Sequence, residues 1–311
     1  MVPRCVIVAG FPRSGTSWLA RGLSFAPGFT YYREPDNHDR VAEAEERFAW
    51  LYLTADRDDP AYRELMTRAC AGRIATAFTM RDDPGPLLSP FGAPGLWLGE
   101  RMPALFRRKS NVLVKLVFAS LNLDWLTASF PHARQLYVLR HQCGQFESWR
   151  RLGWEPRPAR LLEIPQLMAD HLQPFADLLR RASGFWERAG ALWGAMVYVI
   201  RRQTPPESRR EIVAYEWLCG DPVQRFRDLY RRLELDWTAA AESFLTTANH
   251  QGEGWAYSLH RVAARQVDGW RPRLTQGEID ACRRFVEPFE LPYYPGFEPE
   301  VASVTGDLPA R

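Results

Sequence analysis

Lysine is almost missing from this chain of 311 residues. Of its 40 basic residues, only Lys109 and Lys115 are lysines, and the rest are arginines. A position that keeps lysine in such a background is expected to need a compact, mobile ammonium rather than a planar guanidinium. Lys109 stands in the charged run RRKS, where no such need is evident, whereas Lys115 stands in the apolar run NVLVKLVF. Lys115 is therefore a candidate functional residue.

Paired cysteines and long apolar runs are also missing. The five cysteines are scattered, with no C-x-x-C pair, which argues against a disulfide framework and a zinc site and suits a reducing cytoplasm. The longest apolar stretch, 191–200, is well short of the roughly 20 residues that cross a bilayer. The run 6–9 is too short for the apolar core of a signal peptide. These absences predict a soluble, cytoplasmic protein without a membrane partner.

Neither sign of charge is in large excess. A net charge of +3 is too small to favour a nucleic-acid partner, although it leaves room for a local anion site. Hydrophobic residues at 46% are ordinary for a globular protein, and the length allows a sizeable core. No repeat or shift in composition marks a second unit. We expect a single domain over 1–295 and an irregular tail over 296–311.

Apolar segments alternate with helical ones along the chain. Buried strands are expected at 4–9, 29–33, 111–118, 135–140 and 211–215. Helices are expected at 16–25, 59–77, 121–129, 166–202, 222–233, 239–248 and 276–286. This alternation predicts an α/β three-layer sandwich, with a central, mainly parallel sheet between helices. Ligands of such sheets bind beyond the carboxyl ends of the strands, so the residues that follow each strand are the site candidates.

The first strand leads into a glycine-rich loop, GFPRSGTSW. Gly10 and Gly15 have the spacing of a Walker phosphate loop, but Thr16 stands where that loop has lysine. A turn of this kind directs backbone N–H groups and a helix N-terminus at an anion. Thr16 and Ser17 add hydroxyl donors, and Arg13 is placed to reach over the bound group. The alternative is a tight turn before an ordinary helix.

The segment PRSGTSW, 12–18, resembles the 5′-phosphosulfate loop of the sulfotransferases, P-[KR]-[SA]-G-T-[ST]-[WL]. That family uses 3′-phosphoadenosine 5′-phosphosulfate (PAPS) as sulfuryl donor, on a fold similar to the P-loop kinases but without the Walker lysine. The resemblance implies that the phosphosulfate is held by Arg13, Ser14, Gly15, Thr16 and Ser17. It also implies that Trp18 lies against the adenine ring. The alternative for Trp18 is a core position on the first helix.

A second segment, YVLRHQCGQFESWRR, places Arg140 and Ser148 where the family holds the donor's 3′-phosphate. Arginine suits a phosphate because its fork gives two charge-assisted hydrogen bonds, and serine adds a donor. The family's R-D-P is replaced here by Arg140, His141 and Gln142, which leaves the shape of this loop open. A surface ion pair for Arg140 and an exposed Ser148 are the alternatives.

A third segment, VAYEWLCGDP, is similar to the family's Y-E-x-L-x-x-x-P. The resemblance implies that Tyr215 lines the adenine pocket and that Glu216 is structural. The R-K-G loop of cytosolic members is not found. In the corresponding stretch, 258–274, Arg261 and Arg265 are the candidates for completing the 3′-phosphate site.

The resemblance also places the chemistry at the strand ends. Charge that develops on the oxygen bridging sulfur and phosphorus calls for a nearby cation. Relatives have lysine at the end of this strand, which implies Lys115; the alternative is a strand-end lysine that reaches solvent. Val117 stands where cytosolic relatives have their base histidine, so Glu34 in YYREPDNHDR is the candidate base and His38 the reserve. An ion pair of Glu34 with a neighbouring arginine is the alternative. No metal is expected.

The sequence therefore predicts a PAPS-dependent sulfotransferase. Its acceptor would be a hydroxyl, with an amine as second choice, on a small molecule or sugar. That acceptor is expected between a lid, 82–100, and the helices after Ser148, beside Trp97, Trp154 or Trp186. A nucleotide kinase and a non-catalytic nucleotide-binding protein are the rivals. Thr16 counts against the first, and Lys115 with Glu34 against the second. The sequence leaves the oligomeric state open.

Overall fold

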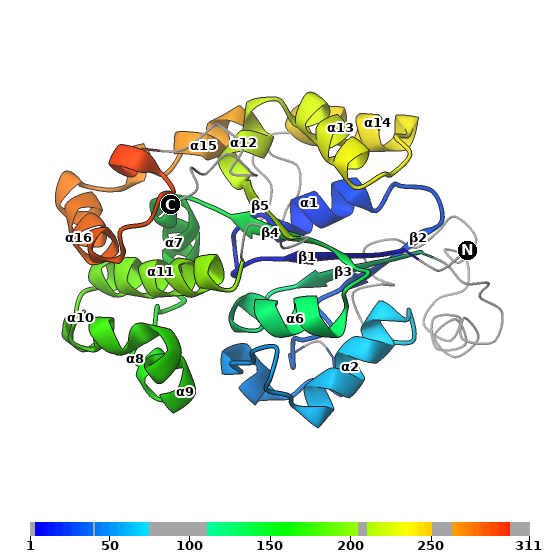
Figure 1. Ribbon diagram of the computed structural model, residues 1–311. Helices are drawn as coiled ribbons and strands as arrows, with labels where there is room; N and C mark the ends of the chain where they lie inside the picture. The colour runs from blue at the N-terminus through cyan, green and yellow to red at the C-terminus, as the bar shows by residue number, and fades with distance from the viewer. Residues whose placement is uncertain (1–3, 40, 75–110, 205–209, 251–262, 299–311) are drawn as a thin grey trace.

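Five parallel strands form the central sheet in the part of the chain that the computed structural model describes (Figure 1). The described residues are 4–39, 41–74, 111–204, 210–250 and 263–298, without the side chains of 248–250, 264 and 265. The strands are β1 (Cys5–Ala9), β2 (Phe29–Arg33), β3 (Asn111–Leu116), β4 (Arg134–Leu139) and β5 (Arg210–Ala214). Their order is β2-β3-β1-β4-β5. The predicted α/β sandwich with a parallel sheet is confirmed; β2 has the predicted bounds, and the ends of the other strands differ from the prediction by at most two residues.

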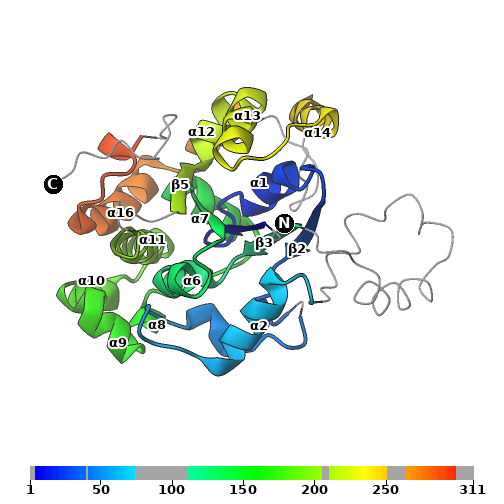
Figure 2. The same ribbon diagram turned by 45° about the vertical axis from the view of Figure 1, so that its right-hand side comes forward.

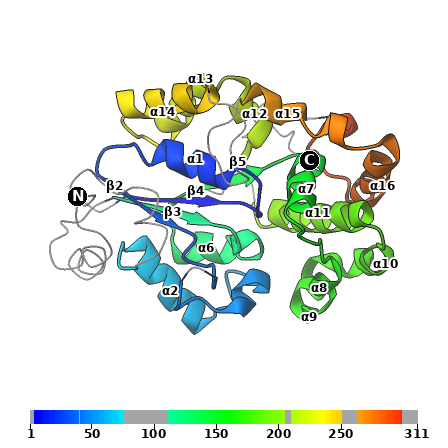
Figure 3. The same ribbon diagram turned by 180° about the vertical axis from the view of Figure 1, so that it is seen from behind.

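Helices cover both faces of the sheet. One face carries α1 (Thr16–Leu23), α13 (Pro222–Arg232) and α14 (Ala239–His250), and the other carries α2 (Pro60–Cys70) and α6 (Leu123–Ser129) (Figures 1, 2 and 3). Every residue after the first is buried in β1, β3 and β4. Strands covered on both sides bury both sets of alternate side chains, which explains their nearly continuous apolar sequence.

The carboxyl ends of β1 and β4 lie at a switch in the direction of the chain. The two strands are neighbours, but the chain leaves β1 toward β2 at one edge of the sheet and leaves β4 toward β5 at the other. Crevices at such points are the usual binding sites of open α/β sheets. The glycine-rich loop follows β1, and Arg140 follows β4. The topology thus brings two of the predicted motifs to one place.

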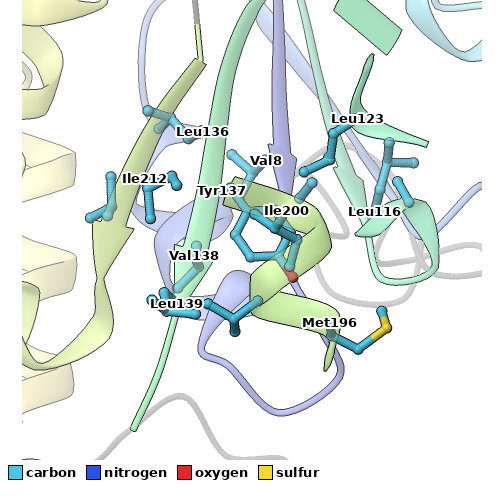
Figure 4. Packing of buried hydrophobic residues seen from close by; sticks show 14 of the residues in the cluster. Val8, Leu116, Leu123, Leu136, Tyr137, Val138, Leu139, Met196, Ile200 and Ile212 are labelled. Carbon is cyan, nitrogen blue, oxygen red and sulfur yellow. The ribbon is translucent and has the colours of Figure 1, made fainter. Parts of the chain in front are cut away.

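A further helical group packs beside β4. It contains α7 (Gln142–Arg151), α11 (Phe185–Arg202) and α16 (Gln276–Val286). Figure 4 shows Ile200 of α11 next to Tyr137 of β4. Helices α11 and α16 approach so closely that a Cβ built on Gly190 would lie 2.3 Å from the carbonyl oxygen of Cys282. Glycine at this position is therefore a packing requirement.

Substituting Gly190 by alanine is expected to destabilise the protein, because the backbone of α16 would have to move. Gly277→Ala is the matched control, since Gly277 also lies in a helix and a Cβ there meets nothing within 4 Å. Both variants replace a helical glycine by alanine, so a loss of stability confined to Gly190→Ala would report packing rather than helix propensity. Urea unfolding should place Gly190→Ala about 1–3 kcal/mol below Gly277→Ala. Equal stability of the two would contradict the close approach of α11 and α16.

The stretch predicted as one helix over 166–202 is broken instead. It comprises α9 (Pro165–Leu167), a π turn Met168–Leu172, a 3₁₀ turn Gln173–Phe175, α10 (Ala176–Arg181) and α11. Pro174 lacks the amide hydrogen that a continuous helix requires. Glu187 accepts hydrogen bonds from the amides of Ser183 and Gly184 and so caps the N-terminus of α11 as a separate helix.

Three short helices were not expected from the sequence: α8 (Ala159–Leu162), α12 (Tyr215–Gly220) and α15 (Ala264–Asp268). Helix α2 ends at Cys70 rather than 77, because Gly72 takes a left-handed φ of 69°. Within the described ranges, no helix is long and apolar enough to cross a membrane.

Candidate active site

The loop after β1 is shaped around Gly15. This residue has a φ of 102° and is the N-cap of α1. A Cβ built on it would lie 2.3 Å from Cδ2 of Tyr215, so both conformation and contact require glycine. As glycine has no side chain to cap the helix, the first amides of α1 remain available to an anion. Ser14 is 1% exposed, and its hydroxyl has no partner among the described residues.

Helix α7 holds the loop from the other side. The carbonyl of Pro12 accepts hydrogen bonds from Gln145 Nε2 at 2.9 Å and from Trp149 Nε1 at 3.0 Å. The ring of Phe11 stacks on Trp149 at 5.4 Å. Gln145 and Trp149 are site residues that sequence reasoning missed, because nothing in a helical pattern marks which polar side chains will reach a distant loop.

Arg13 and Arg140 connect the loop to the end of β4. Arg13 Nε donates to the hydroxyl of Ser148 at 2.9 Å, and Arg140 Nη1 donates to the carbonyl of Arg13 at 3.1 Å. Arg140 Nε is buried and has no partner among the described residues. The structure therefore brings together the first two predicted motifs, which are separated by more than a hundred residues.

Tyr215 joins the third motif to the other two. It is the first residue of α12, directly after β5. The guanidinium of Arg140 lies 4.6 Å from the centre of its ring, and Trp18 packs edge-on against it at 6.0 Å. Trp18 also packs edge-on against Phe226, at 5.2 Å, and is partly buried. Two guanidinium groups, buried hydroxyls and helix amides converge here next to an aromatic wall, a set of groups that fits a phosphorylated aromatic ligand.

Lys115 and Glu34 form a buried ion pair beside this loop. Lys115 lies in β3 opposite Val8 of β1. Val8 is two residues before Gly10, where the glycine-rich loop begins. It is 2% exposed, and its ammonium donates to Glu34 Oε1. Glu34 follows β2, and its amide donates to the carbonyl of Lys115 at 2.8 Å. Asn37 Nδ2 donates to the other carboxylate oxygen, Oε2, at 2.8 Å.

The attraction between Lys115 and Glu34 opposes the effect of burial on the pKa of each group. Burial alone would raise the pKa of Glu34, but the charge and hydrogen bond of Lys115, helped by Asn37, hold that pKa below its ordinary value. Burial lowers the pKa of Lys115, and Glu34 opposes the shift. The sequence predicted both residues as catalytic candidates but did not predict that they bind each other.

A buried carboxyl, Asp36, supports the pair from the same turn. It accepts hydrogen bonds from the amides of Val117, at 3.2 Å, and Phe118, at 2.8 Å, and so ties the end of β3 to the turn after β2. Burial raises the pKa of Asp36 to about 7, and the charge of Glu34 adds to the shift. Sequence reasoning missed Asp36, since its neighbours Pro35 and Asn37 are typical of an exposed turn.

The reserve base, His38, lies at the edge of this cluster. Its ring stacks on Phe118 at 6.3 Å between ring centres, its Nε2 lies 3.5 Å from Asp39, and its side chain is partly exposed. The contacts of the described residues link Lys115 to Glu34, not to His38.

A model of the sulfotransferase family matches residues 3–239 of this chain, well over half of its length. The chain belongs to the sulfotransferase family. Among curated proteins, none matches the sequence.

Several solved sulfotransferases resemble the chain in fold. The domain from the Synechococcus PCC 7002 olefin synthase is 15% identical, with a TM-score of 0.42 over 93% of this chain and 95% of that one. Sulfotransferase STF1 from Mycobacterium tuberculosis H37Rv is 18% identical, with a TM-score of 0.43 over 92% and 77%. Mouse sulfotransferase SULT7A1, complexed with PAP, is 10% identical, with a TM-score of 0.44 over 91% and 82%. These likenesses are weak, so membership rests on the family match.

The loop in which this sulfotransferase departs from R-D-P is built around His141. Its Nδ1 accepts from the amide of Cys143, so the ring proton is on Nε2, which donates to the carbonyl of Phe297 at 3.1 Å. Its ring stacks on Trp270 at 4.8 Å. Burial, with nearby arginines, lowers the pKa of His141 to about 3, so the ring is neutral. Buried Phe297 shows that ordered packing continues past 295.

Glu216 has the structural position that the sequence suggested. It is buried and accepts hydrogen bonds from the amide of His141 at 3.1 Å and the hydroxyl of Tyr294 at 2.8 Å. Burial raises its pKa to about 7, against the opposing charge of Arg140.

Other candidates lie elsewhere or outside the described residues. Trp186 is buried, and its Nε1 donates to Glu278 at 3.0 Å. Trp154 is 37% exposed and packs edge-on against Trp149 at 5.6 Å. Outside the described residues lie the proposed lid 82–100 with Trp97, as well as Arg261 and the side chain of Arg265. All five cysteines are free, and no described group of His, Cys, Asp or Glu side chains is arranged to hold a metal.

Proposed function

We propose that this member of the sulfotransferase family transfers a sulfuryl group from PAPS to a hydroxyl, or secondarily an amine, of a small molecule or sugar. Membership of the family supports sulfuryl transfer. The observation that carries the choice of donor is the buried ammonium of Lys115 next to a phosphate loop with Thr16 in the Walker lysine position.

The donor's two anionic groups are proposed to bind beside the two linked arginines, Arg13 and Arg140. The 5′-phosphosulfate would meet the residues from Arg13 to Ser17 and the first amides of α1. The 3′-phosphate would meet Arg140 and Ser148, which contact the carbonyl and the guanidinium of Arg13, respectively. Tyr215 and Trp18 supply aromatic surface for the adenine. Arg265 or Arg261 is proposed to complete the 3′-phosphate site.

The reaction proposed is an in-line displacement at sulfur. The acceptor oxygen forms the new S–O bond while the bond from sulfur to the 5′-phosphate oxygen breaks, and its electron pair stays on that oxygen. Lys115 would neutralise the charge that develops there. Glu34 would accept the acceptor's proton, with His38 as the alternative base. The product, 3′-phosphoadenosine 5′-phosphate (PAP), then leaves.

Nucleotide binding tests the donor. Calorimetry should show that PAP binds more tightly than AMP, ADP or ATP, because only PAP has a 3′-phosphate for Arg140. Arg140→Ala should reduce the preference for PAP over AMP by about 10–100-fold, the value of a hydrogen-bonded charge. Arg151→Ala is the matched control, since Arg151 is on the exposed side of α7 and pairs with Glu147. Tight ATP binding with no preference for a 3′-phosphate would favour the kinase instead.

Turnover separates an enzyme from a binding protein. PAPS consumption should be measured across a panel of phenols, alcohols, sugars and amines. Acceptor-dependent release of PAP supports the proposal and identifies the acceptor class. Tight PAP binding without turnover on any of them favours the non-catalytic alternative.

A further inference from the structure

The two residues proposed for catalysis, Lys115 and Glu34, form an ion pair with each other. While the ammonium of Lys115 is bonded to Glu34, each charge is compensated by the other, which weakens the attraction of the ammonium for the leaving oxygen. Their mutual bond also keeps the pKa of the carboxyl low, which makes it a weak base. Separating the pair would therefore strengthen both of the roles proposed for these residues.

Glu34 is held in place by more than Lys115. Its φ of 54° is left-handed, its amide is bonded to the carbonyl of Lys115, and Oε2 accepts from Asn37 Nδ2. Lys115, by contrast, is attached to the pair only through a flexible stem. If the pair separates, the ammonium is the mobile partner, while Asn37 keeps the carboxylate oriented with Oε1 exposed to the acceptor.

We propose that donor binding moves the Lys115 ammonium from Glu34 to the donor's 5′ oxygen, so that Glu34 becomes a base only in the donor complex. This inference rests on the proposed function. The exchange couples charge neutralisation to proton transfer. When the ammonium moves to the leaving oxygen, it releases the carboxylate that receives the acceptor's proton. Without donor, the base is neutralised by its own ion pair.

The remaining charges around Glu34 favour proton uptake once Lys115 has moved. Among the described residues, the charged groups that face it are Lys115 on β3, Arg33 on β2 and Asp36 on the same turn. Arg33 Nε is 3.8 Å from Oε1, a weaker contact than the bond from Lys115. Asp36, with a pKa raised to about 7, is mostly uncharged in the acidic range and adds charge of the same sign as Glu34 only at higher pH. With the ammonium gone, burial dominates, and the carboxyl of Glu34 gains affinity for a proton.

Proton linkage measures this exchange without catalysis. PAP retains the 5′-phosphate oxygen that would recruit Lys115, and it does not turn over. Its binding should be titrated calorimetrically between pH 4.5 and 8, in buffers of different ionisation enthalpy, to count the protons taken up. The proteins are the wild type, Glu34→Gln and, as a second variant, Lys115→Met. Adenosine 3′-monophosphate, which lacks the 5′ group, is the control ligand.

The wild type should take up more protons than either variant when PAP binds in the acidic part of this range, by up to about one proton. The control ligand should show no such excess. Because the carboxyl gains a proton on binding, PAP affinity of the wild type falls as pH rises, tenfold for each unit by which its pKa moves. Glu34→Gln lacks this loss and should bind PAP more tightly than the wild type at pH 8.

Equal proton uptake and equal pH dependence in the wild type and Glu34→Gln, with PAP bound by both, would overturn the exchange but leave the proposed function standing. Failure of the wild type to bind PAP at all, or a preference for ATP, would overturn both. Thermal unfolding of each variant confirms that it is folded before its uptake is compared.

Discussion

Glu34→Gln is expected to reduce sulfuryl transfer by about 10²–10⁴-fold, the usual contribution of a positioned general base. Glutamine keeps the size of the side chain and an oxygen that can accept from Lys115, but it cannot take the acceptor's proton. PAP binding should be retained or strengthened, because the donor no longer has to break an ion pair. Initial rates with saturating PAPS and an accepted substrate, together with PAP calorimetry, give both quantities.

His38→Gln is the control for this substitution. His38 lies in the same turn but packs on Phe118 rather than on Lys115, so its variant should keep most of the activity. The opposite result, near-native turnover in Glu34→Gln and a large loss in His38→Gln, would transfer the role of base to His38. Near-native turnover in both variants would mean that the reaction needs no protein base.

Gly15→Ala is expected to abolish PAP binding while the sheet remains folded. A methyl group there would lie 2.3 Å from the ring of Tyr215, and that ring is confined by Arg140 and Trp18. The φ of 102° adds strain for any residue with a Cβ. Together the clash and the strain are worth about 2–5 kcal/mol, and the loop is expected to relax away from its anion-binding shape. Calorimetry with PAP measures the loss.

Gly153→Ala separates strain from contact. Gly153 has a left-handed φ of 69°, but a Cβ built on it meets nothing within 4 Å. Its variant should lose about 1–2 kcal/mol of stability and keep its PAP affinity. Should Gly15→Ala bind PAP as Gly153→Ala does, the contact between Gly15 and Tyr215 would have no part in forming the site.

The sheet and the three segments proposed to bind the donor are predictable because they carry local signals. Apolar runs mark the strands, and glycine spacing marks the loop after β1. The family pattern directs attention to Arg140, Ser148 and Tyr215, and the strand order explains why they meet. Helix interruptions are less visible: Pro174 signals a break in 166–202, but the length of each piece depends on packing that no local pattern contains.

The bond between Lys115 and Glu34 is not predictable in the same way. It depends on β2 and β3 being neighbours with Arg33 opposite Lys115, a register that neither segment specifies alone. The two residues are 81 positions apart. The same limit applies to Asp36, Gln145 and Trp149, whose partners lie on other elements, and to His141, which is tied to Phe297 near the end of the described chain.

The scarcity of lysine makes the buried pair unusually easy to observe. A sample labelled with ¹⁵N only at lysine would contain two side-chain signals, from Lys109 and Lys115. An ammonium shielded from water exchanges its protons slowly, so the buried Lys115 should be the signal that persists. This chain therefore carries its own spectroscopic reporter at the proposed catalytic centre, without an added probe.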